Sequence, residues 1–219
     1  MDSSAARPIA RALATIAIVG ALGVAPTIPA AERSTPTEIL ARVTERDAQV
    51  ESYSAPVHIE ARLHKLFTFH FRFNGTQYYK RPGKMAFDVR AIPPQYRKLF
   101  VELGTPLTWP SLYNLRVVDA PVASTAGYRL EGVPKHACDV RRMLVDVDDE
   151  QTAPLHVFWT TKDGATIDMH LTQQVVAGFQ LPAHAEADIA DGGFKIHAAI
   201  DYGPYVLNET VADSVFNGS

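Results

Sequence analysis

The histidines are the side chains of this sequence with the clearest capacity for chemistry. There are eight of them, and the strand pattern described below places His156 opposite His170 and Glu186 opposite His197 on polar strand faces. Cross-strand histidine pairs can bind zinc or copper, although the spacing fixes no third ligand. The alternative is a solvated outer sheet face, where such pairs change stability by ~0.2–1 kcal/mol. We therefore predict neither a metal ion nor a cofactor.

Other potentially reactive groups have equally ordinary interpretations. The acidic run of Asp146, Asp148, Asp149 and Glu150 lacks the glycine and the spacing of an EF-hand loop, so a solvated turn is favoured. Cys138 is the only cysteine, which excludes a disulfide framework and a cysteine-based zinc cluster. The sequence also contains no nucleophile elbow, P-loop, dinucleotide-binding glycine motif or H-E-x-x-H motif. We expect no catalytic residues and a protein that is not an enzyme.

Composition narrows the class of protein further. The chain has 219 residues, of which 47% are hydrophobic and 21% are charged, with a formal net charge of -3. A chain of this length can bury a core, and its content of aromatic and β-branched residues excludes intrinsic disorder. Weak acidity without a block of lysine or arginine argues against a nucleic-acid partner.

The N-terminus has the pattern of an export signal. Arg7 and Arg11 are followed by an apolar run over 12–25, and small residues after this run offer a cleavage site. The run is shorter than the ~20 apolar residues that span a bilayer. We predict a cleaved signal peptide over 1–31 and a single mature domain over 32–219, exported to the periplasm and without a transmembrane segment.

The first element of the mature chain is predicted to be a helix. Thr35 can cap it, Pro36 suits its first position, and Glu38 completes a capping box. Apolar residues then recur at roughly helical spacing up to about residue 52. The stripe they form is narrow, so this helix must lie against a larger element.

From residue 54 onward the period changes to two, which indicates antiparallel strands with one apolar face. Leu63 and the next four phenylalanines are all odd-numbered, namely Phe67, Phe69, Phe71 and Phe73. The turn between Leu63 and Phe67 therefore needs an odd number of residues, and we predict 64–66. A turn at 81–84 follows. Residues 95–127 show only a short helix or strand near 98–103 and a loop at 104–112.

The turns of two later hairpins can be predicted from whether the apolar residues fall at odd or even positions. A three-residue turn at 162–164 pairs Trp159 with Ile167. Beyond it, the apolar positions change from odd to even numbers, which requires a two-residue turn, and we predict Asp191-Gly192 with Ile189 opposite Phe194. The mature chain is thus expected to have one helix and eight to eleven antiparallel strands. Such strands must pack on another sheet, curl into a barrel or wrap a helix.

The inner faces of these strands differ in side-chain size. One pair of strands presents phenylalanines, whereas the last pair presents alanines at its apolar positions. Small side chains on a concave sheet leave volume, and aromatic ones give that volume an apolar wall. The alternative is that the helix at 35–52 fills the space as a packed core. The residues predicted to line an apolar ligand cavity are Phe67, Phe69, Phe71, Phe87, Trp159, Met169, Phe179 and Ala185.

Two segments resemble a known family. The stretch from Phe73 to Val89, with its Y-Y-x-x-P-x-K core, and the stretch from Gly178 to Pro182 are similar to the LolA/LolB-like lipoprotein carriers and their RseB-like relatives. The order of elements over 35–207 also resembles that family. The resemblance implies a mainly β (α+β) fold, namely a curved, incompletely closed antiparallel β-barrel with an N-terminal helix in its concave face. In the family a strand-borne arginine holds the helical lid, but Arg62 and Arg72 are predicted to point away from the apolar face, so this role is not transferred.

The resemblance also implies a function. We expect a periplasmic binding or carrier protein whose concave apolar cavity takes the acyl chains of a lipid or lipoprotein, with outer membrane lipoprotein sorting as the family's process. The first alternative is an envelope-stress regulator or assembly factor that binds a periplasmic protein partner. The second alternative is a metal-dependent hydrolase built from the histidines and carboxylates.

Overall fold

The structure is a computed structural model that describes residues 38, 41–42, 49–89, 94–118, 127–148 and 153–218. The chain divides into Met1–Arg33 and Ser34–Ser219, and every described residue belongs to the second unit. The predicted signal peptide and most of the helix predicted over 35–52 therefore lie outside the described residues. Glu38, Ala41 and Arg42 are helical. No helix within the described ranges has the length and apolar character needed to cross a membrane.

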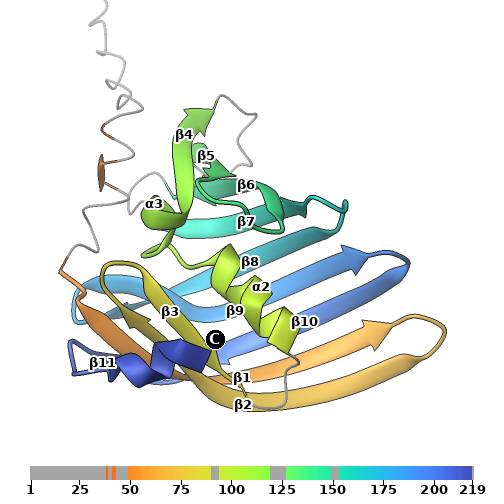
Figure 1. Cartoon of the computed structure of the whole chain (residues 1–219), viewed down its shortest axis with the longest axis horizontal. Helices are drawn as coiled ribbons and strands as arrows, with labels where there is room; N and C mark the ends of the chain where they lie inside the picture. Colours follow the sequence, from red (N-terminus) through yellow and green to blue (C-terminus); the bar gives the residue numbers. More distant parts are fainter. Residues whose placement is uncertain are drawn as a thin grey trace, which may run out of the picture. The chain divides into compact units, whose positions relative to one another are not determined.

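The described elements are mostly strands (Figure 1). In chain order they are β1 (Ser52–His64), β2 (Thr68–Lys80), β3 (Lys84–Asp88), α2 (Pro94–Leu103), α3 (Trp109–Leu112), β4 (Tyr113–Val118), β5 (Tyr128–Pro134), β6 (Val140–Val147), β7 (Pro154–Thr161), β8 (Thr166–Val176), β9 (Phe179–Asp191), β10 (Phe194–Tyr202), β11 (Val206–Leu207) and the 3-10 helix η1 (Asp213–Gly218).

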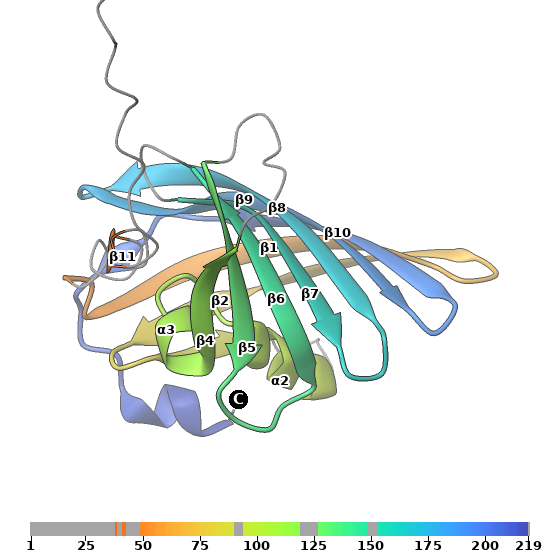
Figure 2. The ribbon, with the colours of Figure 1, turned by 90° about the horizontal axis from the view of Figure 1, so that it is seen from above.

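These strands form one 11-stranded sheet in the described part of the chain, with the order β3-β2-β1-β10-β9-β8-β7-β6-β5-β4 and with β11 paired to β1. All paired strands are antiparallel. The sheet is strongly curved, and its two edge strands, β3 and β4, do not close it into a barrel (Figure 2). The expected curved and open antiparallel architecture is confirmed.

In the β1–β2 hairpin the apolar side chains share one face, as predicted, but the turn lies one residue later in the chain. The turn has three residues, as predicted, but it occupies 65–67, and Leu63 therefore lies opposite Phe69. Moving the turn by one residue changes the register by two, which leaves every side chain on the same face. The predicted division into an apolar and a polar face is therefore unchanged.

The two later hairpins have different outcomes. Trp159 lies opposite Ile167, as predicted. In the β9–β10 hairpin the two-residue turn is Gly192-Gly193 instead of Asp191-Gly192, so Ile189 lies opposite Ile196 and the predicted pairing with Phe194 is wrong. Both turn residues have positive φ, 48° and 101°. Two glycines reach this conformation without the steric cost that Asp191 would meet in the first position.

Helices α2 and α3 lie on the concave side of the sheet (Figure 2). The largest core cluster joins Leu103 and Trp109 of the helical segment to strands β4 to β8, including Met143 and Trp159. A second cluster joins β1, β3, β9 and β10 around Ile59. The concave face is therefore where the sheet and the helices share their buried apolar side chains.

Candidate binding site

The eight side chains predicted to line an apolar cavity occupy three environments. Phe87, Trp159, Met169 and Ala185 belong to or pack against the two clusters beneath the helices. Phe179 packs against a third cluster. Phe67, Phe69 and Phe71 are exposed at the free end of the β1–β2 hairpin. The structure thus groups four of the eight under the helices, three at the hairpin end and one elsewhere.

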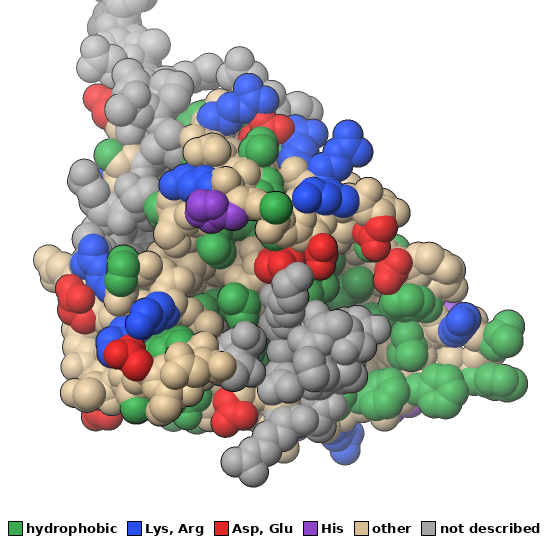
Figure 3. Space-filling model, viewed as in Figure 1, with side chains coloured by type: hydrophobic (Ala, Val, Ile, Leu, Met, Phe, Trp, Pro, Cys, Tyr) green, Lys and Arg blue, Asp and Glu red, His purple; other side chains and the backbone are tan. Residues whose placement is uncertain are grey.

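The exposed group contains four of the seven large hydrophobic side chains that are exposed in the described part of the chain. Leu66, Phe67, Phe69 and Phe71, which we call the aromatic tip, have exposed fractions of 84%, 73%, 51% and 41%. Hydrophobic side chains gather in a row at this end of the hairpin, on the same side of the sheet as α2 (Figures 1 and 3). Clustered exposed apolar side chains typically mark an interaction site.

The aromatic tip is continuous with the buried core. Phe71 stacks on Phe73, with ring centroids 6.1 Å apart and planes 7° from parallel. Phe73 in turn packs against the cluster that contains Phe87. One apolar path therefore runs along the concave side from the exposed hairpin end to the contact between the sheet and α2.

The centre of the concave face is filled by the protein itself. The cavity left between α2, α3 and the sheet has a volume of about 50 Å³ and is lined by residues that include Phe100, Leu103, Trp109 and Met169. Ligand pockets usually enclose about 300–1,000 Å³. Of the two alternatives left open by the sequence, packed core or vacant hollow, the structure has the packed core at the centre. The packing segment is 94–112; the helix over 35–52, which was expected to fill the space, lies mostly outside the described residues.

This segment was only partly predicted. The short helix or strand expected near 98–103 is helix α2, and the loop expected over 104–112 contains the helical turn α3. Leu99, Phe100 and Leu103 are spaced to share one helix face, and this signal could have identified the covering segment. Two hydrogen bonds from aromatic side chains to the backbone fix its conformation. Trp109 Nε1 donates to the Leu103 carbonyl at 3.1 Å, and Tyr113 Oη donates to the Glu102 carbonyl at 2.7 Å.

Unpaired polar atoms lie where this segment meets the sheet. Thr105 Oγ1 and Trp159 Nε1 are buried, with the Tyr53 and Tyr113 side chains as polar neighbours, but neither atom makes a well-aligned hydrogen bond with the described residues. Both residues line the small cavity. A buried unsatisfied polar group costs about 1–3 kcal/mol. The contact between the covering segment and the sheet therefore contains polar atoms without a well-aligned partner.

The outer face of the sheet is polar and carries rows of histidines and carboxylates. His156 lies opposite His170, as predicted. The predicted pairing of Glu186 with His197 is wrong, because the shifted β9–β10 turn places Asp188 opposite His197. His197 Nδ1 is bonded to Asp188 at 3.0 Å. Asp168 completes a group with His156 and His170 whose potential ligand atoms all lie within 4.8 Å of one another.

The remaining reactive candidates are held in ordinary contacts. Asp146 is buried and bonded to Arg129, with 2.7 Å between Nη2 and Oδ2, so it is not part of a solvated turn. Burial disfavours its charged form, but the bonds from Arg129 and His156 lower the pKa of Asp146 below its ordinary value. Asp149 and Glu150 lie outside the described residues. Burial raises the pKa of the half-buried Cys138 thiol, which is consistent with an unreactive side chain.

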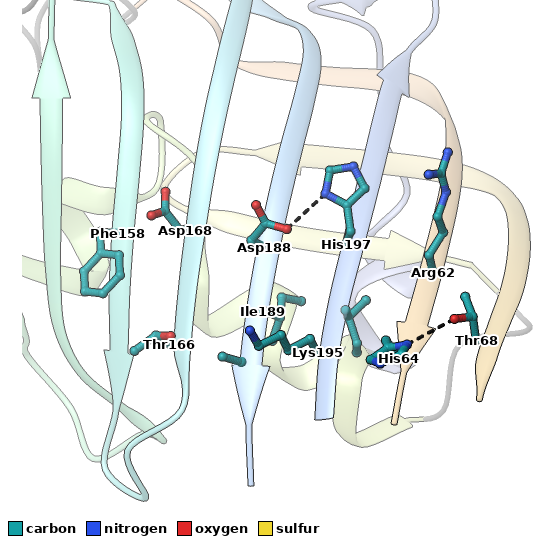
Figure 4. A pocket seen from close by; sticks show the side chains of 12 residues that line it. Arg62, His64, Thr68, Phe158, Thr166, Asp168, Asp188, Ile189, Lys195 and His197 are labelled. Carbon is teal, nitrogen blue, oxygen red and sulfur yellow. Dashed lines mark hydrogen bonds and ion pairs between the residues drawn. The ribbon is translucent and has the colours of Figure 1, made fainter. Parts of the chain in front are cut away.

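A groove of about 660 Å³ crosses the outer face near the hairpin ends of β1, β8, β9 and β10. Arg62, Asp168, Asp188 and His197 line it, and Figure 4 shows the Asp188 carboxylate directed toward the His197 ring. Arg72 is bonded to Glu60 on the same outer face, at 3.0 Å. Both arginines therefore point away from the apolar face, as predicted. Sequence reasoning missed the groove because its lining comes from strands that only the final register brings together.

Comparisons with known proteins support the fold. No family model matches the sequence, and no curated protein matches it significantly. A LolA superfamily protein from Nitrosomonas europaea is similar in structure, with 13% identity, a TM-score of 0.58, and coverage of 84% of this chain and 98% of that chain. A DUF1329 family protein from Desulfovibrio piger has 13% identity, a TM-score of 0.59, and coverage of 82% and 95%.

A third structure is named as an outer membrane lipoprotein-sorting protein domain, from Vibrio parahaemolyticus. It has 12% identity and a TM-score of 0.57, and the match covers 83% of this chain and 96% of that chain. At identities of 12–13%, these comparisons establish only the fold of the backbone. The protein therefore has the LolA-like fold that the sequence resemblance predicted.

Proposed function

We propose that this protein is a periplasmic carrier or binding protein for the acyl chain of a lipid or lipoprotein, and that the acyl chain binds first at the aromatic tip. The observation that carries this proposal is the continuity of the exposed tip with the buried apolar face beneath α2. An acyl chain is an extended apolar ligand, and a continuous apolar path of this kind fits its shape. The export pattern over 1–31 and the LolA-like fold agree with this proposal.

The driving force would be burial of apolar surface. Removal of apolar surface from water is worth about 25 cal/mol per Å², or about 0.8 kcal/mol per methylene. The aromatic tip offers three phenylalanine rings and a leucine whose exposed fractions range from 41% to 84%. Because this attraction is non-directional, we expect weak discrimination among acyl chains of similar length.

A ligand that reaches the centre of the concave face must displace the covering segment. The cavity of about 50 Å³ is too small for an acyl chain. Movement of α2 and α3 away from the sheet would give Thr105 Oγ1 and Trp159 Nε1 access to water, which lowers the cost of opening. In this proposal the aromatic tip binds the acyl chain first. The segment 94–112 then acts as a lid, which opens so that the acyl chain can be buried against the concave face.

The test is binding of a fluorescent fatty acid by untagged protein purified from the periplasm, together with lipid extraction and mass spectrometry. Replacing Phe69 and Phe71 with Ser should weaken binding at least tenfold and leave the melting temperature nearly unchanged, because both rings are exposed. The matched control replaces Val133 and Val175 with Ser, since these apolar side chains are exposed on other strands. Equal affinity in the tip variant and the control would reject the tip as the site.

The two tryptophans of the chain, Trp109 and Trp159, allow the lid to be followed separately. In a Trp159→Phe variant, the emission of Trp109 should shift to longer wavelength when the fatty acid binds, because α3 then leaves its buried position. An unchanged emission at saturation would limit binding to the tip. The partner-binding alternative would be favoured if one other protein co-purified in place of lipid, and if this co-purification were lost when Phe69 is replaced.

A further inference from the structure

The geometry points to a divalent metal site, of the kind that takes Zn²⁺, formed by His156, Asp168 and His170 on the outer face of the sheet. The ligands come from two neighbouring strands: His156 from β7, and Asp168 and His170 from β8. His170 lies directly opposite His156, and Asp168 is two residues before His170 on the same face of β8. This site is independent of the apolar concave face.

The three side chains already converge. His156 Nε2 lies 2.7 Å from Asp168 Oδ1, and His170 Nε2 lies 3.6 Å from the same oxygen. The two imidazole rings are stacked, with centroids 4.6 Å apart. Ligand atoms bound to a tetrahedral Zn²⁺ at 2.0–2.2 Å are about 3.3 Å from one another. Small rotations about the side-chain bonds therefore suffice to place all three atoms around one ion.

The surroundings hold the more buried histidine in an orientation suited to metal binding. His156 Nδ1 lies 3.2 Å from Asp146 Oδ2, on β6, so it can donate to this carboxylate while Nε2 faces Asp168. Asp146 is itself fixed by a two-bond contact with Arg129. A carboxylate behind a metal-binding histidine is a recurrent arrangement that fixes the ring and strengthens the ligand. Asp146 is thus a positioning residue.

Charge and access also favour a cation. Glu186 and Asp188 lie opposite His170 and Asp168 on β9, so carboxylates flank the site. The exposed fraction of the side chain rises from 26% at His156 to 44% at Asp168 and 70% at His170, which leaves the site open to ions from solvent. Two imidazoles and one carboxylate form a ligand set that suits Zn²⁺ and leaves a fourth position for water.

Other histidines on this face provide matched controls. His184 is bonded to Asp201 at 2.7 Å, and His197 to Asp188 at 3.0 Å. Neither belongs to the convergent group formed by two histidines and a carboxylate. If the site were only one more histidine–carboxylate pair, all these histidines would contribute equally to metal binding.

The experiment is a Zn²⁺ titration by calorimetry on untagged, chelator-treated full-length protein, with the Co²⁺ absorption spectrum as a second readout. We expect one equivalent of bound Zn²⁺ and an intense visible Co²⁺ spectrum of a four-coordinate ion. His156→Ala and His170→Ala should each weaken binding at least tenfold and abolish the Co²⁺ spectrum, while His184→Ala and His197→Ala retain both. Because His170 is largely exposed, its variant should keep the melting temperature of the metal-free protein.

Asp146→Asn tests the positioning role. It should weaken Zn²⁺ binding about tenfold while the stoichiometry stays at one, and Co²⁺ should still give a four-coordinate spectrum with altered intensity. The inference is overturned if the wild-type protein binds no stoichiometric Zn²⁺, or if the control variants weaken binding as much as His170→Ala. Neither result depends on whether the protein binds acyl chains.

Discussion

Phe87 of edge strand β3 and Phe100 of α2 stack on each other, with ring centroids 5.2 Å apart and planes 15° from parallel. This contact ties the covering segment to one edge of the open sheet, while Leu103 and Trp109 pack toward β4 to β8. The segment 94–112 therefore spans the concave face from one side of the sheet to the other. The stacked pair is the natural place to weaken the lid without altering the aromatic tip.

Phe100→Ala should loosen this lid. Loss of a half-buried ring and of its stacking with Phe87 should lower the free energy of unfolding by about 2 kcal/mol. The same change should increase the fluorescence of an apolar dye such as 1-N-phenylnaphthylamine, because the concave face becomes accessible. Phe69→Ala, which removes an exposed ring, is the control and should barely change stability. Lower stability without added dye binding would count against a lid role for this segment.

Gly75→Ala should disrupt the pairing of β2 with β3. A methyl group at this position would collide with the backbone carbonyl of Asp88 and lie 2.5 Å from Val89 Cγ2. Since a backbone atom cannot move aside cheaply, the cost should be about 3 kcal/mol, measured by urea denaturation. Gly178→Ala is the contrasting variant: it meets no atom within 4 Å, and its positive φ of 88° should cost only about 1 kcal/mol. Equal effects of the two variants would show that the close approach at β3 does not exist in solution.

Asp213 should make the attachment of η1 depend on pH. Its Oδ1 lies 3.0 Å from Lys80 Nζ and 3.1 Å from Lys84 Nζ, and these bonds lower the pKa of Asp213 below its ordinary value. Because the folded-state pKa is the lower one, this contribution to stability is present above about pH 4 and is lost as the pH falls further. Hydrogen exchange of η1 should therefore be faster, relative to the intrinsic rate, at pH 3 than at pH 6.

Asp213→Asn should remove this pH dependence, whereas Glu209→Gln in the same C-terminal segment should preserve it. High salt should weaken the effect in the wild-type protein, since the charges are exposed. A pH profile of η1 that is identical in wild type and Asp213→Asn would show that the lysine contacts do not hold the helix.

The candidate sites show where sequence reasoning reached its limit. His156 and His170 could be paired from strand parity alone, but Asp168 was not recognised as the third member of the group. The side chains of Asp168 and His156 meet diagonally across β7 and β8, because Asp168 is directly opposite Phe158. Diagonal neighbours on a sheet remain within reach of long side chains, so the predicted strand register already placed Asp168 near His156.

The sequence by itself determined the face to which strand side chains belong, the odd or even length of the hairpin turns, and the LolA-like arrangement of strands. The first two follow from the two-residue period of a strand, which is a local property of the chain, whereas the arrangement of strands was predicted from the resemblance of two short segments to a known family. Only the tertiary structure decided which segment fills the hollow and which aromatic side chains remain outside it. Leu103 and Trp109 fill the space beside Trp159 because residues distant in sequence meet there, and the volume they occupy depends on the curvature of the whole sheet.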